Sequence, residues 1–312
     1  MAQHRSWAWQ RRTLLAVTIA ALSYTVGLLL PLKSADRFKA VERISDRASA
    51  QLPDGSRLWD KGEILALSET RVLQDHVARI VRLEDRQKQI YSYTVPQKFQ
   101  GQTIKSIPVA GDRKVIALTF DDGPWPKSTN DILYILKKHN IKATFFLLGR
   151  NIQNFPNLAK IIVKHGHVVA NHSWSHPYHQ HSQAAAAREI DRTDEIIYQT
   201  TGAKSALFRP PGGYLNNGLA SYAASRKNTV VMWSADSQDY RASSTRQIQN
   251  VINNAGQGGI VLMHDGGGDR RKTVNALPII IKKLKEQGYT FVTVPELMEM
   301  QAKTEQQQPP AQ

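Results

Sequence analysis

The 312-residue sequence contains no cysteine. This absence excludes a disulfide scaffold, cysteine-ligated zinc or iron–sulfur centres, and catalysis by a thiol. It fits an extracytoplasmic setting, although a cytoplasmic protein can also lack cysteine by chance. Acidic residues are few, with 26 Asp and Glu against 41 Lys and Arg, for a formal charge of +15. The basic excess is spread along the chain and not gathered in one arm, which argues against nucleic acid as a partner.

Long hydrophobic runs are rare, and the main one lies near the N-terminus. Residues 13–32 are 20 uncharged, mostly aliphatic residues, which as a helix reach about 30 Å, the thickness of a bilayer core. Arg5, Arg11 and Arg12 precede this run, so the positive-inside rule predicts a cytoplasmic N-terminus. We expect residues 1–32 to be a transmembrane signal-anchor of a single-pass membrane protein with an extracytoplasmic catalytic domain. A cleaved signal peptide is the alternative, and it would leave the domain secreted.

Three further segments follow this run. Residues 33–110 are predicted to form a juxtamembrane stem, with an amphipathic helix over 65–83 and turn residues near both ends. Residues 111–300 are predicted to form the catalytic domain. Residues 301–312 are polar and rich in Gln and Pro, which predicts a disordered tail.

The catalytic segment alternates short, β-branched apolar runs with longer amphipathic ones. This alternation predicts an α/β fold with a parallel sheet, either open or closed into a barrel, and periodicity does not choose between the two. The predicted strands are 115–120, 143–148, 168–170, 206–208, 229–233, 260–263 and 289–292, and the predicted helices lie near 128–139, 155–165, 183–200, 216–226, 245–255 and 274–287.

Polar clusters begin where five of these strands end. Loops that leave the carboxyl ends of parallel strands converge on one face of the sheet, where active sites are built. A turn or helix cap explains any one cluster but not all five together. The clusters are Asp121-Asp122-Gly123, His172 with His176, Arg209 to Gly213, Asp236 with Asp239, and His264-Asp265.

The residue types in these clusters suit metal-assisted hydrolysis of an acyl group. Two histidines spaced i, i+4 and one carboxylate supply three ligands and leave positions open, as in a catalytic metal site. Neighbouring residues in extended chain point apart, so Asp121 and Asp122 are expected to act differently, one on the metal and one as a base. His264 can act as an acid oriented by Asp236 or Asp239, while Arg209 can pair with the base.

The five clusters resemble the five motifs of the polysaccharide deacetylases, the NodB-homology family of carbohydrate esterases. The matching stretches are TFDDGP (119–124), HSWSH (172–176), RPP (209–211), DSQDY (236–240) and LMH (262–264). The resemblance covers about residues 112–298, and it implies a distorted (β/α) TIM-like barrel with a divalent metal, usually zinc.

Carried over residue by residue, the resemblance assigns each role. It implies that Asp121 is the catalytic base, oriented by Arg209, and that His264 is the catalytic acid with Asp236 as its partner. The implied metal ligands are Asp122, His172 and His176, and Leu262 is implied to line the pocket for the acetyl methyl. The other candidate substrate-binding residues, chosen for their residue type and position, are Gly212, Tyr214, Tyr240 and Trp174.

Two departures from the family pattern bear on substrate shape. The family commonly has an aromatic residue soon after Arg-Pro-Pro, whereas here Gly212 and Gly213 come before Tyr214. The fourth motif usually ends in Trp, and Tyr240 stands there instead. Trp125, Trp174 and Tyr214 are aromatic residues that can stack on sugar faces, and ordinary packing is the alternative for each.

The predicted function is removal of N-acetyl groups from N-acetylglucosamine units of a polysaccharide, with peptidoglycan favoured. Chitooligosaccharide N-deacetylation and xylan O-acetyl esterase activity are alternatives within the family. A non-catalytic wall-glycan-binding protein is the alternative from another class. Two other enzyme classes are weighed as alternatives. A non-haem iron oxygenase also binds its metal with two His and one carboxylate. A glycoside hydrolase uses two carboxylates several Å apart, which the adjacent Asp121 and Asp122 suit poorly. The sequence indicates no protein partner.

Overall fold

The structure is a computed structural model that describes residues 78, 93, 95–111 and 113–307. The predicted signal-anchor of residues 1–32, the stem helix predicted near 65–83 (apart from residue 78) and the end of the tail lie outside this part of the chain. Among the described residues, no helix is both long enough and apolar enough to cross a bilayer.

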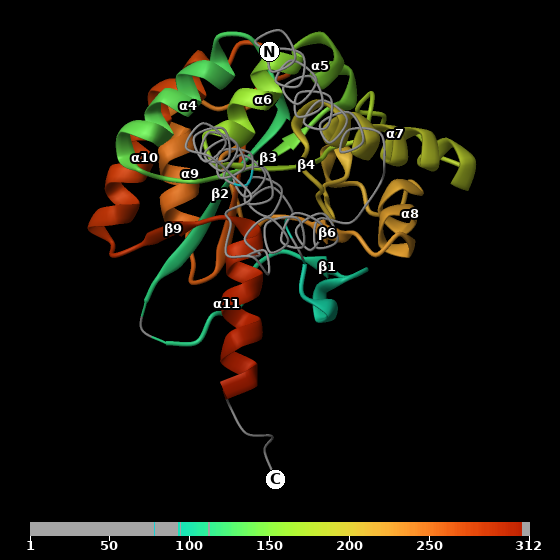
Figure 1. The fold of residues 1–312 in the computed structure, drawn as a ribbon. Coiled ribbons are helices and arrows are strands. Elements are labelled where there is room, and N and C mark those ends of the chain that lie inside the picture. Colours follow the sequence, from blue (N-terminus) through green and yellow to red (C-terminus); the bar gives the residue numbers. More distant parts are fainter. Residues whose placement is uncertain (1–77, 79–92, 94, 112, 308–312) are drawn as a thin grey trace, which may run out of the picture. The chain divides into compact units, whose positions relative to one another are not determined.

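A parallel sheet forms the centre of the domain, and helices cover it on the outside (Figure 1). The strand order is β1-β6-β5-β4-β3-β2-β8-β7, with β9 paired to β2. The strands are β1 (Thr103–Ile104), β2 (Val115–Gly123), β3 (Thr144–Leu147), β4 (Val168–Asn171), β5 (Leu207–Phe208), β6 (Thr229–Val231), β7 (Ala235–Asp236), β8 (Gly259–His264) and β9 (Thr290–Val292).

The helices alternate with these strands along the chain. They are α4 (Ser128–His139), α5 (Gly149–Asn154), α6 (Pro156–Lys164), α7 (Gln183–Thr201), α8 (Leu219–Ser225), α9 (Ser244–Asn254), α10 (Arg271–Glu286) and α11 (Val294–Gln307), with the 3-10 turns η1 (Gln97–Phe99) and η2 (Pro211–Gly213). Capping residues set both ends of α7. The Ser182 hydroxyl accepts a hydrogen bond from the N–H of Ala185 at the start of α7, and Gly202 ends that helix in the left-handed conformation.

Strand β2 holds the sheet together. All nine of its residues are buried, and it pairs with β3, β8 and β9. A strand that is covered on both faces reads as a continuous apolar run, which is why VIALTF carries no alternation. The same strand ends in Asp121, Asp122 and Gly123, so the most buried element of the fold delivers the first polar cluster.

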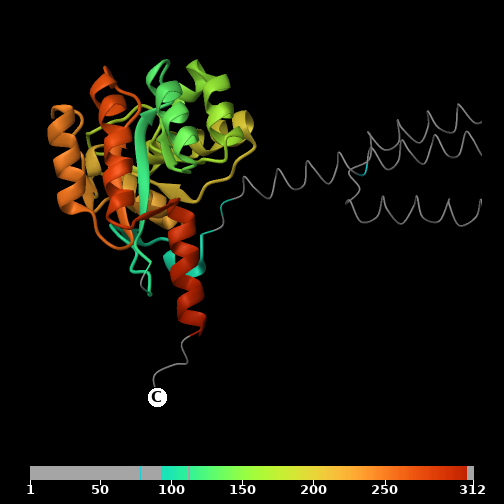
Figure 2. The same ribbon diagram turned by 90° about the vertical axis from the view of Figure 1, so that its left-hand side faces the viewer.

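The predicted fold class is confirmed at the level of a curled, parallel α/β sheet. Each of the seven predicted strands and six predicted helices has a counterpart in the structure. Within the described residues no pairing joins β1 to β7, so the sheet is an open path, consistent with a distorted barrel. The edge view in Figure 2 shows helices packed along this sheet and α11 extending away from it.

The predicted boundary between stem and catalytic domain is wrong. Residues well before 111 belong to the domain, because β1 pairs with β6 and a hydrophobic cluster contains Val95, Phe99, Ile107 and Val109. The turn residues in this stretch look like a linker, and the two-residue strand is too short to show a period. The unit Arg79–Gln312 is compact and contains the described strands and hydrophobic clusters, so it carries its own core.

The disordered tail predicted from residue 301 does not begin there in the structure. Helix α11 continues to Gln307, and the Lys98 ammonium lies 2.6 Å from the carboxylate of Glu305. The residues between Gln301 and Gln307 are mostly good helix formers, and Pro309 is the first strong helix breaker. Residues 308–312 lie outside the described part of the chain.

Candidate active site and metal centre

The five polar clusters meet at the carboxyl ends of the strands, as predicted. The parallel register places Asp121 of β2 beside His264 of β8, and Asn171, which precedes His172, beside Phe208, which precedes Arg209. The same end of β3 lies between β2 and β4. Sheet register alone therefore brings the first, second, third and fifth clusters to one edge of the sheet.

Asp122, His172 and His176 form a cluster able to hold a metal ion. One ligand atom from each lies within 4.8 Å of the others. The Asp122 Oδ1 is 3.5 Å from His172 Nε2 and 3.4 Å from His176 Nε2. This oxygen is buried and has no hydrogen-bond partner among the described atoms. A buried carboxylate oxygen facing two imidazoles is the arrangement that a cation satisfies, so the residues present fit a divalent metal.

His172 is held in the form that a metal ligand requires. Its Nδ1 lies 2.8 Å from the backbone carbonyl of Arg209, so Nδ1–H donates and Nε2 keeps its lone pair. Burial lowers the pKa of His172 to about 3, which leaves the ring neutral at physiological pH. A neutral imidazole is the ligating form.

The loop between the two histidines is anchored by Glu189 of α7, a residue that the sequence did not single out. One Glu189 carboxylate oxygen accepts the N–H groups of Trp174 and Ser175, and the other accepts the Ser175 hydroxyl. Ser173 and His176 adopt positive φ angles of 71° and 60°, a conformation that costs energy outside glycine. The three hydrogen bonds that this carboxylate accepts offset that cost and hold the loop that carries His176.

Arg209 is fully buried and holds Asp121. Its Nη1 donates to Asp121 Oδ1 at 2.7 Å and to the Thr119 hydroxyl at 2.8 Å, and its Nε donates to the carbonyl of Val231. The other oxygen of Asp121 lies 3.7 Å from His172 Nε2, toward the metal cluster. Burial raises the pKa of Asp121, while the Arg209 charge opposes that rise. The predicted contact between Arg209 and Asp121 is present.

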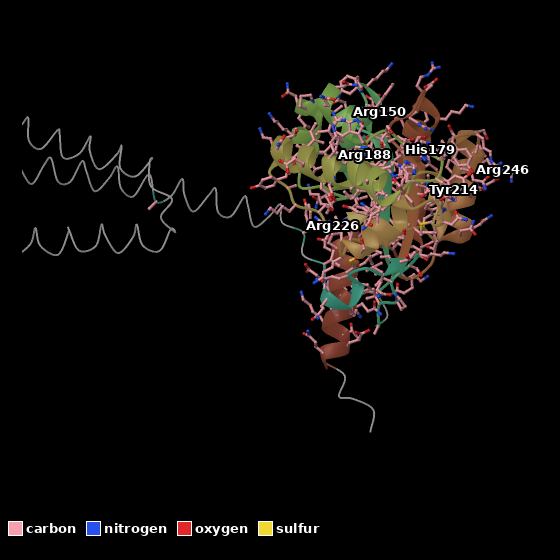
Figure 3. The ribbon with its side chains drawn as sticks, turned by 90° about the vertical axis from the view of Figure 1, so that its right-hand side faces the viewer. Arg150, His179, Arg188, Tyr214, Arg226 and Arg246 are labelled. Atoms are coloured by element: carbon pink, nitrogen blue, oxygen red, sulfur yellow. The ribbon has the colours of Figure 1, made fainter. Side chains whose placement is uncertain are left out.

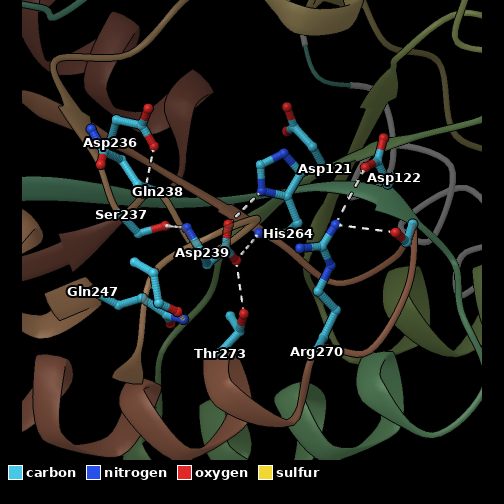
Figure 4. Close-up of polar contacts among 12 residues, drawn as sticks. Asp121, Asp122, Asp236, Ser237, Gln238, Asp239, Gln247, His264, Arg270 and Thr273 are labelled. Carbon is cyan, nitrogen blue, oxygen red and sulfur yellow. Dashed lines mark hydrogen bonds and ion pairs between the residues drawn. The ribbon is translucent and has the colours of Figure 1, made fainter. Parts of the chain in front are cut away.

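His264 pairs with Asp239 and not with Asp236 (Figure 4). The His264 Nδ1 lies 2.7 Å from Asp239 Oδ1, and Asp239 Oδ2 accepts the His264 N–H and the Thr273 hydroxyl. Asp236 instead accepts the backbone N–H of Gln238. The contact that the resemblance assigns to Asp236 is therefore wrong, and Asp239 makes it. Burial alone would lower the pKa of His264, but the Asp239 carboxylate raises that pKa to about 9.

A third carboxylate, Asp265, lies directly behind the Asp pair and was given no role from the sequence. Its Oδ2 accepts the Thr129 hydroxyl at 2.5 Å, and the Ser128 hydroxyl donates to its backbone carbonyl. A Cβ at Gly123 would collide with this carboxylate, so glycine is required there. Burial raises the pKa of Asp265 to about 7. Asp265 thus fixes the turn that follows the two catalytic-site aspartates.

The chain is similar in sequence to known polysaccharide deacetylases. The sequence profile described as polysaccharide deacetylase matches residues 109–231. A peptidoglycan-N-acetylglucosamine deacetylase of Bacillus cereus is 40% identical over 193 residues, which make up 61% of this chain and 91% of the relative. The chain belongs to the polysaccharide deacetylase family. The family predicted from the five motifs is confirmed, and with it the enzyme class, a polysaccharide deacetylase that hydrolyses amide bonds.

Two further relatives match this chain over most of its described residues. The peptidoglycan-N-acetylmuramic acid deacetylase PdaC of Bacillus subtilis is 41% identical over 203 residues, which cover 64% of this chain and 42% of PdaC. The crystal structure of the Bc1960 peptidoglycan N-acetylglucosamine deacetylase superposes with a TM-score of 0.61 at 36% identity, over 65% of this chain and 94% of that one.

Two of the predicted substrate-binding residues, Gly212 and Tyr214, lie on the His176 side of the metal cluster. Gly212 and Gly213 have φ angles of 61° and 72°, and a Cβ at Gly212 would press on the rings of Tyr178 and Tyr214, so glycine is required there. The Tyr178 ring lies edge-on to His176 and Tyr214, with centroids 4.9 and 5.8 Å away. Tyr178 was not predicted. Tyr214 is exposed on the face shown in Figure 3.

The other side of the site carries Tyr240 and Leu262. Tyr240 is exposed and lies edge-on to His264, with ring centroids 6.1 Å apart. Leu262 is buried in β8, two residues before His264, and pairs with Thr119 of β2 and Asp236 of β7. Both residues therefore lie near His264, and their roles in binding substrate stay predictions.

The half-buried Trp174 ring is packed against two neighbours. Its indole packs against Gly149, which has no room for a Cβ, and the Arg192 guanidinium lies 3.4 Å from the ring centroid. Both partners come from helices outside the motif, so the sequence around Trp174 does not reveal them. Trp174 therefore has a packing role, and its contact with substrate stays a prediction.

Replacing Asp239 by asparagine tests the corrected partner of His264. We expect kcat to fall about 100-fold, since a general acid contributes roughly 10²- to 10⁴-fold. The upper limb of the pH profile should also move to lower pH, because the carboxylate that raises the pKa of His264 is gone. The measurement is kcat against pH for Asp239→Asn beside Asp236→Asn. A larger loss in the Asp236 variant would restore Asp236 as the partner.

Proposed function

We propose that the deacetylase removes N-acetyl groups from N-acetylglucosamine units of peptidoglycan, with a divalent metal held by Asp122, His172 and His176. One observation carries the proposal: Asp121 and His264 lie on neighbouring strands beside that triad, each with a dedicated partner. A proton acceptor and a proton donor beside one metal site are what amide hydrolysis requires.

The donor set supports zinc as the metal. Two imidazole nitrogens and one carboxylate oxygen, with positions left open, are a recurrent catalytic zinc set. When bound there, the ion polarises an acyl oxygen and lowers the pKa of water.

Asp121 is placed to accept a proton from the attacking water. Arg209 binds Oδ1, so Oδ2, which lies toward His172, is the oxygen available for proton transfer. Arg209 and Thr119 fix the carboxylate in one orientation, and Arg209 balances its charge. A base held this way accepts the proton without first having to reorient.

His264 is placed to donate a proton to the departing amine. With a pKa of about 9, the ring is protonated at neutral pH. Asp239 holds Nδ1, so Nε2 is the nitrogen that faces the site. An amine is a poor leaving group unless it is protonated, which makes this donor necessary for an amide.

Peptidoglycan is supported by the activities for which the relatives are named and by charge. One relative is named for N-acetylglucosamine and another for N-acetylmuramic acid in peptidoglycan. A formal charge of +15 favours an anionic cell wall as surroundings. Export through the hydrophobic run of residues 13–32, as a membrane anchor or a cleaved signal, is part of the same proposal.

Acetate release tests the proposal. The unit Arg79–Gln312, stripped of metal by a chelator and then reloaded with zinc, is incubated separately with purified peptidoglycan, with N-acetylglucosamine oligomers and with O-acetylated xylan. We expect acetate only after reloading. Acetate from O-acetylated xylan alone would move the substrate to the ester alternative. Metal binding without acetate from any acetylated glycan would favour the non-catalytic, glycan-binding alternative.

A further inference from the structure

A shallow groove of about 350 Å³ lies between the start of α4 and the corner where α5 meets α6. These three helices lie together on one side of the sheet (Figures 1 and 2). We call it the asparagine groove, because Asn130, Asn154 and Asn157 line it together with Pro126, Phe155 and Ile161. None of these residues takes part in the chemistry described above.

Helix capping does not explain the three asparagines. Each lies at a helix terminus, where asparagine commonly caps the backbone. However, the N-cap positions of α4 and α6 are Lys127 and Phe155, and neither helix start has a side-chain cap bond. Among the described residues, the three side-chain amides make no hydrogen bond to the protein. All three asparagines are exposed to solvent, so their amides are free to meet a ligand at this groove.

The other lining residues are apolar. Phe155 is half-buried and Ile161 is 37% exposed. Trp125, also 37% exposed, lies edge-on to Phe155 with ring centroids 6.2 Å apart. Within the part of the chain that the structure describes, no charged side chain lines the groove, which argues against a phosphate, a carboxylate or a cation as its ligand. An amide both donates and accepts, as adjacent hydroxyls do, and an apolar surface fits the C–H face of a sugar ring.

The groove is tied to the metal-binding loop on both sides. Pro126 follows Asp122 by four residues, on the turn that Asp265 and Thr129 hold. On the other side, the Asn151 amide of α5 donates to the backbone carbonyl of Asp122 at 2.7 Å, and Asn154 lies three residues further along. The groove is therefore built from segments that directly adjoin the one carrying Asp122.

We infer that the asparagine groove binds an uncharged sugar ring of the glycan, at a distance from the unit that loses its acetyl group. This inference rests on the proposed function. It assigns Asn130 and Asn157 to hydrogen bonds with sugar hydroxyls, and Phe155 with Trp125 to contact with the ring. Longer oligomers should accordingly be better substrates than short ones, because only they reach the groove.

Chain-length dependence tests the inference. The ratio of kcat/KM for the N-acetylglucosamine hexamer to that for the dimer is measured in the zinc-loaded unit Arg79–Gln312. We expect the Asn130→Ala/Asn157→Ala variant to lower this ratio about tenfold, with the dimer rate near wild type. Gln153→Ala is the matched control, since this exposed neighbour on α5 does not line the groove, and its ratio should not change.

An unchanged ratio in the double variant would overturn the inference, whether both rates stay at wild type or both fall together. The second case would mean that the asparagines act through the metal-binding loop. Failure of the proposed function is separate, because the wild-type unit would then release no acetate from either oligomer.

Discussion

Replacing Asp121 by asparagine is expected to lower kcat about 1,000-fold while the protein still binds its metal. The amide keeps the shape of the carboxylate and can still accept from Arg209, but it does not take up a proton. General bases contribute roughly 10²- to 10⁴-fold, and Asp121 is the buried carboxylate whose free oxygen faces the metal cluster. The measurement is kcat for acetate release together with bound zinc per chain.

The matched control for this variant is Asp122→Asn. Asp122 contributes the orphaned oxygen of the triad, so its replacement should lower zinc affinity and activity together. Equal zinc loss in the two variants would contradict the separation of base and ligand. Near-normal turnover in the Asp121 variant would assign the base to another residue.

Replacing Arg209 by methionine is expected to lower the free energy of unfolding by about 3–5 kcal/mol, the usual cost of removing one partner of a buried ion pair. The Arg209 guanidinium has no solvent exposure, and it lies 4.0 Å from the ring centroid of Phe146. Its loss would leave Asp121 charged and unpaired, and would remove a hydrogen-bond donor from the hydroxyl of Thr119 and from the carbonyl of Val231. Urea unfolding of the zinc-loaded protein measures the change.

An exposed arginine is the control for this measurement. Arg246 lies on the surface of α9 (Figure 3), and Arg246→Met should change stability by less than about 0.5 kcal/mol. We also expect Arg209→Lys to recover little, because an ammonium cannot reproduce the planar set of bonds made by the guanidinium. Equal stability of the Arg209 and Arg246 methionine variants would remove Arg209 from the buried network.

Much of the site could be predicted because its residues follow strands. An apolar run that ends in a polar cluster marks the carboxyl end of a strand, and parallel strands share that end. Asp121, Asp122, His172, Arg209 and His264 all follow this rule, so the pattern of the sequence is enough to predict that they converge. Glu189 and Asn151 lie within helices, where a polar residue carries no such signal, and both were missed.

The partner of His264 shows where local sequence is insufficient. Asp236 and Asp239 are three residues apart in one motif, and either could orient the imidazole. Register places Asp236 beside Leu262 at the end of β7. The chain then turns, so Asp239 meets both the His264 ring and the Thr273 hydroxyl of α10. The choice depends on a helix that begins more than 30 residues later in the chain.

By itself, the sequence determined the order of seven strands and six helices, the edge of the sheet that carries the chemistry, and the family. These depend on hydrophobic period and on short motifs, which act locally. Only the tertiary structure decided that residues 95–109 belong to the domain, that Asp239 holds His264, that Trp174 is covered by Arg192, and that three asparagines meet in one groove. Each of these is a contact between segments far apart in the chain, and no local pattern encodes which distant surface a side chain will meet.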